Sequence, residues 1–340
     1  MGKVVVRIPN HLGDCIMALP GILSLIASRP EDEFHLLAPM WAESLYRSAG
    51  SFTFLPVHQS RLHGLPAIRY QVPLLRQGRY DTGVLMTPSF SSALIFLLGG
   101  VKHRYGFAAD HRDFALNHPV AGYPVTRHRS DEFVKLLESF CNDTLTVDLP
   151  RVEVSPAAQS GALTMLEKTS VDLRSGFAVI APCAIARSRR WGADNYAQLA
   201  RRLVRDLGIG VFLVGTREEF DDGEIIADAD KNICNLCGQT DIELAAAVLA
   251  QARLFVGNDS GLAHLAAAID IPLVVLSGAD NPAETSPLSR KKTVIIKDHL
   301  DCISCVKNAC PLPGDQFMRC MRGITVDEVF NAASVRLERT

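Results

Sequence analysis

Short apolar runs alternate along this chain with segments in which apolar residues recur at helical spacing. The apolar runs lie at 3–8, 34–37 and 82–86 in the first half and at 176–180, 210–214, 253–256 and 272–276 in the second. The segments with helical spacing lie at 16–28, 195–207, 242–251 and 325–337. Strands that alternate with helices predict parallel sheets covered on both faces. The fold class is therefore α/β, with two Rossmann-like domains whose parallel sheets face each other across a cleft.

The alternating pattern restarts near the middle of the chain. The stretch 152–159 contains Pro156 and small polar residues, which are typical of an interdomain link. We therefore expect an N-terminal domain over 1–160 and a C-terminal domain over 161–324. The remaining residues, 325–340, are predicted to form a helix, and we consider it a candidate to pack back on the N-terminal domain.

Composition narrows the class of protein without identifying it. The chain has 340 residues, 48% of them apolar, and a formal net charge of −2, which argues against a general nucleic-acid binder. The longest apolar run, 93–98, is too short to span a bilayer. The N-terminal run becomes polar at Arg7, before a signal peptide would form. We expect a cytoplasmic protein, with a peripheral position on a membrane surface as an alternative.

The segment 257–268 is the most informative motif in the sequence. Asp259, Ser260 and Gly261 follow an apolar strand and precede an Ala/Leu-rich helix pattern that contains His264. Side chains at this point can cap the helix, and its backbone amides can receive an anion. A polar turn at the carboxyl end of a parallel strand is where open α/β sheets bind nucleotides. The segment is therefore predicted to bind a phosphorylated ligand.

Three further turns in the second half carry polar side chains. Ser188 and Arg189 lie in a run with three arginines before a helix, where cations conflict with the helix dipole unless an anion is bound. The alternative is a solvated basic loop. Glu218 or Glu219, after the strand 210–214, is placed to bond a ribose hydroxyl, although a charged first helical turn explains them equally well. Thr240 lies in a segment, 237–241, that we expect beside a nucleotide base.

The first turn of the chain, after the strand 3–8, contains His11, Gly13 and Asp14. Asp14 is explained either as a helix cap or as a carboxylate that accepts a proton from an incoming hydroxyl. His11 is a rival base because its ordinary pKa lies nearer neutrality. An exposed turn residue is the alternative explanation of His11.

Nine cysteines occur in the chain, and four of them crowd together near its end. The odd number favours reduced thiols over a disulfide framework. Four close thiolates can bind zinc or an iron–sulfur cluster, although the spacing matches no common pattern closely. The alternative is a compact loop with free thiols or a reversible disulfide. The candidate metal ligands are Cys302, Cys305, Cys310 and Cys320.

Together these motifs resemble the ADP-heptose:lipopolysaccharide heptosyltransferases, glycosyltransferase family nine, which have the GT-B fold. The resemblance rests on Gly13-Asp14, Arg189-Arg190-Trp191, the run 236–240 and above all the run 259–268. Cys310-Pro311 and Cys320-Met321 are similar to the heptosyltransferase II branch. The chain lacks the glycine patterns of dehydrogenases and P-loop ATPases, Gly-x-Gly-x-x-Gly and Walker A.

The resemblance implies inverting transfer of heptose from ADP-heptose to a hydroxyl of the lipopolysaccharide inner core at the inner membrane surface. It implies Asp14 as general base and Arg189 on the donor pyrophosphate, with arginines in place of a metal ion, so that catalysis needs no cofactor. The remaining donor contacts would come from Ser188, Glu218, Thr240, Asp259, Ser260, Gly261 and His264.

The acceptor is expected on the first domain, where 102–129 holds five Lys/Arg and four His against two Asp. A local basic surface suits an anionic acceptor, and a solvated loop is the alternative. The candidate acceptor-binding residues are His11, Lys102 and Arg104. Two other functions remain open at this point: another nucleotide-sugar transferase or epimerase of the same fold, or a non-catalytic protein whose cysteines bind metal.

Overall fold

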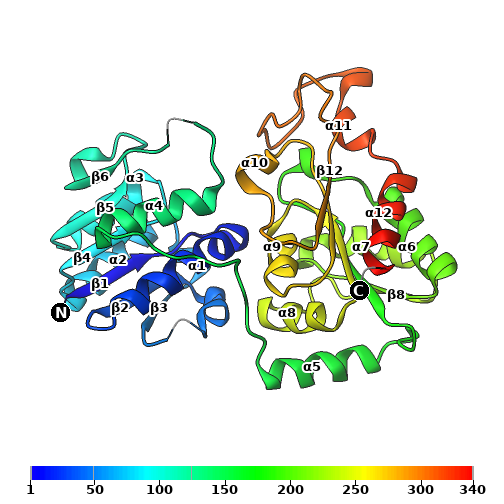
Figure 1. The fold of residues 1–340 in the computed structure, drawn as a ribbon, viewed down its shortest axis with the longest axis horizontal. Helices are drawn as coiled ribbons and strands as arrows, with labels where there is room; N and C mark the ends of the chain where they lie inside the picture. The colour runs from blue at the N-terminus through cyan, green and yellow to red at the C-terminus, as the bar shows by residue number, and fades with distance from the viewer. Residues whose placement is uncertain (1, 49, 124, 339–340) are drawn as a thin grey trace. The chain divides into compact units, whose positions relative to one another are not determined.

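The computed structural model describes residues 2–48, 50–123 and 125–338. It divides into two compact units, Met1–Pro150 and Arg151–Thr340, and each contains one six-stranded parallel sheet (Figure 1). The predicted α/β class with two Rossmann-like domains is confirmed, and the cleft between them stays a prediction. None of the helices in the described residues combines the length and the apolar character that crossing a membrane requires.

The sheet of the first unit has the strand order β3-β2-β1-β4-β5-β6. Its strands are β1 (Lys3–Arg7), β2 (Glu33–Pro39), β3 (Thr53–Val57), β4 (Thr82–Leu85), β5 (His103–Phe107) and β6 (His118–Val120). Its helices are α1 (Leu12–Ser28), α2 (Gly64–Gly78), α3 (Phe90–Leu98) and α4 (Arg129–Cys141). Helix α1 packs against α4, and α2 packs against α3.

The sheet of the second unit has the order β12-β11-β10-β7-β8-β9. Its strands are β7 (Phe177–Ala181), β8 (Gly210–Leu213), β9 (Ile233–Asn235), β10 (Leu254–Asn258), β11 (Leu273–Leu276) and β12 (Lys292–Ile295). Its helices are α5 (Pro156–Glu167), α6 (Ala193–Leu207), α7 (Phe220–Ala227), α8 (Ile242–Gln251), α9 (Gly261–Ala268), α10 (Pro282–Thr285), α11 (Arg319–Arg322) and α12 (Val326–Glu338).

The central strands are buried on both faces, which explains why they are continuous apolar runs rather than alternating ones. In β1, Val4, Val5 and Val6 are all buried. Val5 belongs to the core that the sheet forms with α2 and α3. In the second unit, side chains of β7, β8, β10 and β11 form a core with α6 and α12. These packed layers hold the loops at the strand ends in fixed positions.

Two boundaries differ from the expected ones. The division between units falls after Pro150, ten residues before the expected end of the first domain. The expected link 152–159 runs into α5, because Ser155 caps that helix and Pro156 occupies its first turn, where a missing N–H costs nothing. Helix α5 packs against α8, and the Ser155 hydroxyl donates to Glu243 at 2.5 Å, which ties this segment to the second unit.

The C-terminal helix, expected over 325–340, is α12, and its buried face belongs to the core of the second unit. Val329, Phe330, Ala333 and Leu337 are buried there, and the helix packs against α6, β10 and β11. The Arg202 guanidinium of α6 lies 3.8 Å from the centre of the Phe330 ring. The buried face of this helix is therefore used within the second unit, and packing of the helix on the N-terminal domain stays a prediction.

Replacement of Phe330 by alanine is expected to lower the free energy of unfolding of the second unit by about 3 kcal/mol, the usual cost of a lost buried aromatic ring. Denaturant unfolding followed by Trp191 fluorescence in a Trp41→Phe background measures this, because Trp191 is buried in the same core. Val335→Ala on the exposed face of α12 is the matched control and should change stability by less than about 0.5 kcal/mol. An unchanged Trp191 transition in Phe330→Ala would contradict the packing.

Candidate active site

The polar turns of the first unit gather where the direction of strand connection reverses. Strand β1 lies between β2 and β4. From the carboxyl end of β1 the chain connects to β2 on one side, and from the carboxyl end of β4 it connects to β5 on the other side. The loops diverge at this point and leave a crevice, the usual ligand position in an open α/β sheet. The residues after β1 and after β4 line one pocket, with a volume of about 510 Å³.

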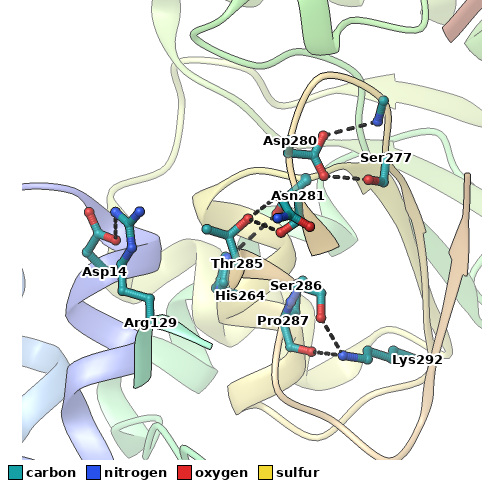
Figure 2. Close-up of polar contacts among 12 residues, drawn as sticks. Asp14, Arg129, His264, Ser277, Asp280, Asn281, Thr285, Ser286, Pro287 and Lys292 are labelled. Carbon is teal, nitrogen blue, oxygen red and sulfur yellow. Dashed lines mark hydrogen bonds and ion pairs between the residues drawn. The ribbon is translucent and has the colours of Figure 1, made fainter. Parts of the chain in front are cut away.

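Asp14 and His11 both line this pocket, so the structure brings these two predicted residues together. Helix α1 begins at Leu12, four residues before the expected start, and its N-cap residue is His11. Asp14 is therefore in the first helical turn and is not a cap. Its Oδ1 accepts a hydrogen bond from Arg129 Nη1 at 3.4 Å (Figure 2). The capping explanation is thereby removed, and the carboxylate remains a candidate base.

Lys102 and Arg104 lie at the opposite edge of the sheet from Asp14. They flank the start of β5, whereas Asp14 follows the end of β1, and the strands are parallel. Lys102 Nζ pairs with Asp81 at 2.7 Å, and Arg104 donates to the carbonyls of Val101 and Ala115 at 2.6 Å each. Both cations are thus used in the local structure at the amino end of the sheet. Their role in acceptor binding stays a prediction, and it would require an acceptor that also reaches the edge of the sheet opposite Asp14.

In the second unit the direction of strand connection reverses between β7 and β10, as it does between β1 and β4 in the first unit. The loop after β7 contains the short helix Arg187–Arg189, and the loop after β10 leads into α9, with Ser260 at the N-cap position. Asn258, the last residue of β10, is fully buried, and its Nδ2 donates to the Pro182 carbonyl at 2.8 Å. This bond joins the two loops. The predicted turns that contain Arg189 and Asp259 therefore lie on the two sides of the topological switch point, where open α/β sheets have their crevice.

Three buried polar atoms around this crevice have no hydrogen-bond partner. They are Nε of Arg189, Oδ1 of Asn258 and Oγ of Ser260, among six such side-chain atoms in the described residues. The Ser260 hydroxyl does not cap α9, contrary to the expectation for this turn. A buried polar group without a partner costs about 1–3 kcal/mol. Their concentration beside a helix N-terminus is typical of a site that is completed by a polar ligand.

Two carboxylates are buried behind the same crevice. Asp259 is 2% exposed and Asp280 is 1% exposed, and they follow the neighbouring strands β10 and β11. Asp280 accepts hydrogen bonds from the Ser277 hydroxyl at 2.5 Å and the Gly278 amide at 3.1 Å (Figure 2). Asp259 Oδ2 accepts from Thr285 at 3.2 Å, and its Oδ1 lies 3.6 Å from His264 Nε2.

The two carboxyls ionise differently. Burial opposes ionisation of Asp259, but the hydrogen bond and charge of the neighbouring His264 hold its pKa below the usual value. Burial, followed by the negative charge of Asp259, raises the pKa of Asp280 to about 6. The positive groups nearest the pair are His264 of α9, Arg189 and Lys292 of β12. Ionisation of Asp259 alone is therefore favoured over ionisation of both carboxyls.

The other predicted donor residues lie at the same edge of this sheet, but their side chains differ in exposure and in whether they are already hydrogen-bonded within the protein. The Ser188 hydroxyl is buried and donates to the Lys307 carbonyl, so it is used within the protein. Glu218 is exposed after β8, and hydrogen bonds from its own amide and Thr216 lower its pKa. Thr240 is half-buried after β9. His264 is 4% exposed, so it supports Asp259 from within α9.

The expected metal site at the cysteine-rich loop stays a prediction. Cys302, Cys305, Cys310 and Cys320 are free thiols. In the part of the chain that the structure describes, no three His, Cys, Asp or Glu side chains are grouped so as to hold a metal ion. Cys310 Sγ instead accepts the Met318 amide at 3.3 Å, and burial raises the pKa of the Cys320 thiol.

Sequence reasoning assigned no individual role to two residues that the structure places at these sites, although it indicates the loop 278–282 as a further one that faces the cleft. Arg129 was counted only within the basic stretch 102–129, although it contacts Asp14. Asp280 lies in the loop that follows the strand ending at Leu276, and a position after the carboxyl end of a strand is the sequence feature that indicates it.

Asp280 should make the second unit less stable as the pH rises from about 4 to 6. Its folded pKa lies above its unfolded value of 3.8, so the folded state binds the extra proton and loses that advantage as the proton leaves. The loss is at most about 3 kcal/mol for a shift of roughly two units. Denaturant unfolding at pH 4 and 7 should show this fall in the wild type relative to Asp280→Asn, which retains a neutral side chain of the same shape. Parallel pH curves for the two proteins would contradict the raised pKa.

Comparison with known proteins places the sequence among glycosyltransferases. Residues 72–315 match glycosyltransferase family 9 (heptosyltransferase). The chain is 32% identical to lipopolysaccharide heptosyltransferase 2 of Salmonella typhimurium over 86% of its length and 87% of the relative's.

Solved structures extend this agreement to the whole fold. The Escherichia coli ADP-heptose lipopolysaccharide heptosyltransferase II is 26% identical, with a TM-score of 0.80 over 99% of each chain. A family 9 glycosyltransferase from Veillonella parvula shares the fold at 18% identity, with a TM-score of 0.82 over 100% of this chain and 98% of its own. The two Rossmann-like units are those of the GT-B architecture, and the chain belongs to glycosyltransferase family 9, the heptosyltransferases.

Proposed function

We propose that this enzyme transfers a heptosyl group from ADP-heptose to a hydroxyl of the lipopolysaccharide inner core, with inversion at the anomeric carbon. The observation that carries the proposal is the cluster of unpartnered buried polar atoms on Arg189, Asn258 and Ser260 at the crevice of the second unit. The names of the similar proteins, a lipopolysaccharide heptosyltransferase 2 and an ADP-heptose heptosyltransferase II, support the choice of donor and acceptor class.

In this proposal the second unit binds the diphosphate of the donor. As the bond between the anomeric carbon and the phosphate oxygen breaks, its electron pair leaves with ADP, and negative charge increases on the diphosphate oxygens. A guanidinium and the N-terminus of α9 stabilise that charge better in the transition state than in the bound donor. Arg189 Nε, the Ser260 hydroxyl and the turn at Gly261 are the groups assigned to the diphosphate. Glu218 and Thr240, at the ends of β8 and β9, are assigned to the nucleoside.

Asp14 is proposed as the general base on the first unit. The acceptor oxygen forms its bond to the anomeric carbon as its proton passes to the carboxylate of Asp14. Asp14 is suited to this because its side chain is 20% exposed at the edge of the 510 Å³ pocket rather than buried in a cap. The acceptor sugar would occupy that pocket, where His11 is the neighbouring polar group.

The proposed reaction needs neither a metal ion nor an organic cofactor, because Arg189 supplies the positive charge beside the leaving group. The acceptor is part of a lipid-anchored saccharide, so we place the enzyme in the cytoplasm at the surface of the inner membrane. The donor and the acceptor are assigned to different units, and the reaction therefore requires the two units to bring Asp14 and the bound donor together.

Replacement of Arg189 by alanine should weaken ADP binding by roughly 1.5–3 kcal/mol, the range for a hydrogen bond to a charged group. Titration calorimetry with ADP measures the change directly. Arg187→Ala is the matched control, since Arg187 lies in the same turn with its side chain exposed, and it should bind ADP with wild-type affinity. Equal ADP affinity in wild type and Arg189→Ala would exclude the proposed diphosphate contact.

Replacement of Asp14 by asparagine should lower kcat by about 10²–10⁴, the usual share of general base catalysis, while ADP affinity and the unfolding midpoint stay unchanged. ADP release from ADP-heptose in the presence of heptose-deficient lipopolysaccharide core measures turnover. Retention of full turnover in Asp14→Asn would rule out this carboxylate as the base. Absence of ADP release by the wild-type enzyme would instead argue for a different nucleotide sugar, which thermal-shift measurements with a panel of nucleotide sugars would identify.

A further inference from the structure

The ion pair between Asp14 and Arg129 lies within the pocket assigned to the acceptor. Both residues line that pocket, and Arg129 Nη1 donates to Asp14 Oδ1 at 3.4 Å. The two side chains come from different helices, since Asp14 is in the first turn of α1 and Arg129 is the first residue of α4. Figure 2 shows the guanidinium turned toward the carboxylate.

The packing of α1 against α4 fixes the distance between these residues. Gly21 of α1 lies so close to α4 that an added Cβ would come within 2.9 Å of Leu137 Cδ1 and 3.4 Å of Val134 Cγ2. Gly21 favours this close approach, because a side chain there would require Leu137 to shift. Leu137 is fully buried at this contact. The start of α4 is thus held beside the start of α1, and Arg129 reaches Asp14 from a rigid element.

The position of Arg129 is not explained by helix stability. A cation in the first turn is unfavourable because the N-terminal end of the helix dipole is positive, and the first turn of α4 otherwise carries Asp131 and Glu132. The Arg129 side chain is 41% exposed, and a pair this exposed contributes little to folding. Stability therefore provides no reason for an arginine here, whereas the contact with Asp14 does.

The charges around the pocket point to the same role. Among the described lining residues Arg129 is the one lysine or arginine, while Asp14, Asp110 and Glu132 are carboxylates and His11 and His63 are imidazoles. The single guanidinium contacts the one carboxylate that the proposed reaction uses.

We propose that Arg129 is a positioning residue for the base: it holds Asp14 through Oδ1 and leaves Oδ2 directed to the acceptor hydroxyl. This inference rests on the proposed function of Asp14. The proton of the acceptor passes to Asp14 alone, and Arg129 stays protonated throughout. Arg129 therefore acts on the rate of the chemical step through the orientation of Asp14, and not through a contact with the acceptor.

The test is a double-mutant cycle on heptosyl transfer with the full-length enzyme, using ADP release from ADP-heptose in the presence of heptose-deficient core. Arg129→Ala should lower kcat by up to about 10²-fold, the effect of a reacting group displaced by roughly 1 Å. The KM values for donor and acceptor should change by less than about twofold, as expected for an interaction that acts only in the transition state. In the Asp14→Asn background the same replacement should cause no further loss of kcat.

Rescue experiments separate positioning from a general structural effect. Arg129→Lys should recover part of kcat, and guanidinium at millimolar concentration should raise the rate of Arg129→Ala while leaving Asp14→Asn unchanged. Arg127→Ala is the matched control, because Arg127 is exposed and its guanidinium lies 5.7 Å from the centre of the Tyr123 ring rather than in the pocket. That control should keep wild-type kcat and KM.

Two results would overturn the inference. An equal loss of kcat on Arg129→Ala in the wild-type and Asp14→Asn backgrounds would show that Arg129 acts independently of the base. A rise in the acceptor KM with unchanged kcat would show a direct contact with the acceptor. Failure of the proposed function is a separate outcome, because wild-type enzyme would then release no ADP from ADP-heptose whatever residue occupies position 129.

Discussion

All strands of a parallel sheet end at the same edge, and this constraint governs where the chemistry of each unit can lie. The loops after β1 and β4 in the first unit, and after β7 and β10 in the second, leave the sheet in opposite directions. Each pair therefore opens a crevice without any need for special residues in the sheet. Asp14 and Arg129 occupy one crevice, and Arg189, Asp259 and the start of α9 occupy the other. The buried valine-rich strands supply rigidity, and the loops and first helical turns at their carboxyl ends carry the candidate site residues.

The same constraint explains which parts of the site could be predicted from sequence. Asp259 and Ser260 directly follow an apolar strand, and Asp14 lies at the start of the helix that follows another, so their position at the carboxyl edge can be inferred from chain order alone. Lys102 and Arg104 precede or begin a strand, and grouping them with a basic stretch ignored the strand direction that puts them at the other edge. Arg129 could not be found in this way, because its contact with Asp14 joins two helices 115 residues apart in sequence. Periodicity located the helices, but it left their first turns uncertain, and α1 begins at Leu12 because His11 is already extended.

The second crevice combines features that oppose stability with features that suit an anionic ligand. Unpartnered atoms on Arg189 and Ser260, together with two buried carboxyls, all cost free energy in the folded chain. Asp280 reduces that cost by holding its proton to a higher pH than an ordinary carboxyl does. The negative charge is thereby concentrated on Asp259, which has His264 and Thr285 as partners. A diphosphate would find positive and hydrogen-bonding groups toward the crevice, with the carboxylates turned to the interior.

The backbone hydrogen bonds of the cysteine-rich loop connect it to two of the turns in the second unit. The Asn308 carbonyl accepts the Ser188 amide at 3.1 Å, so the loop holds the turn that contains Arg189. The amides of Ser304 and Val306 bond the carbonyls of Gly278 and Ala279 at 3.0 and 2.6 Å, which ties the same loop to the turn of Asp280. One segment thus braces the loops that follow β7 and β11, on either side of β10 in the sheet. Because an arginine binds a diphosphate well only when its backbone is fixed, the loop would support the proposed donor site by holding these turns.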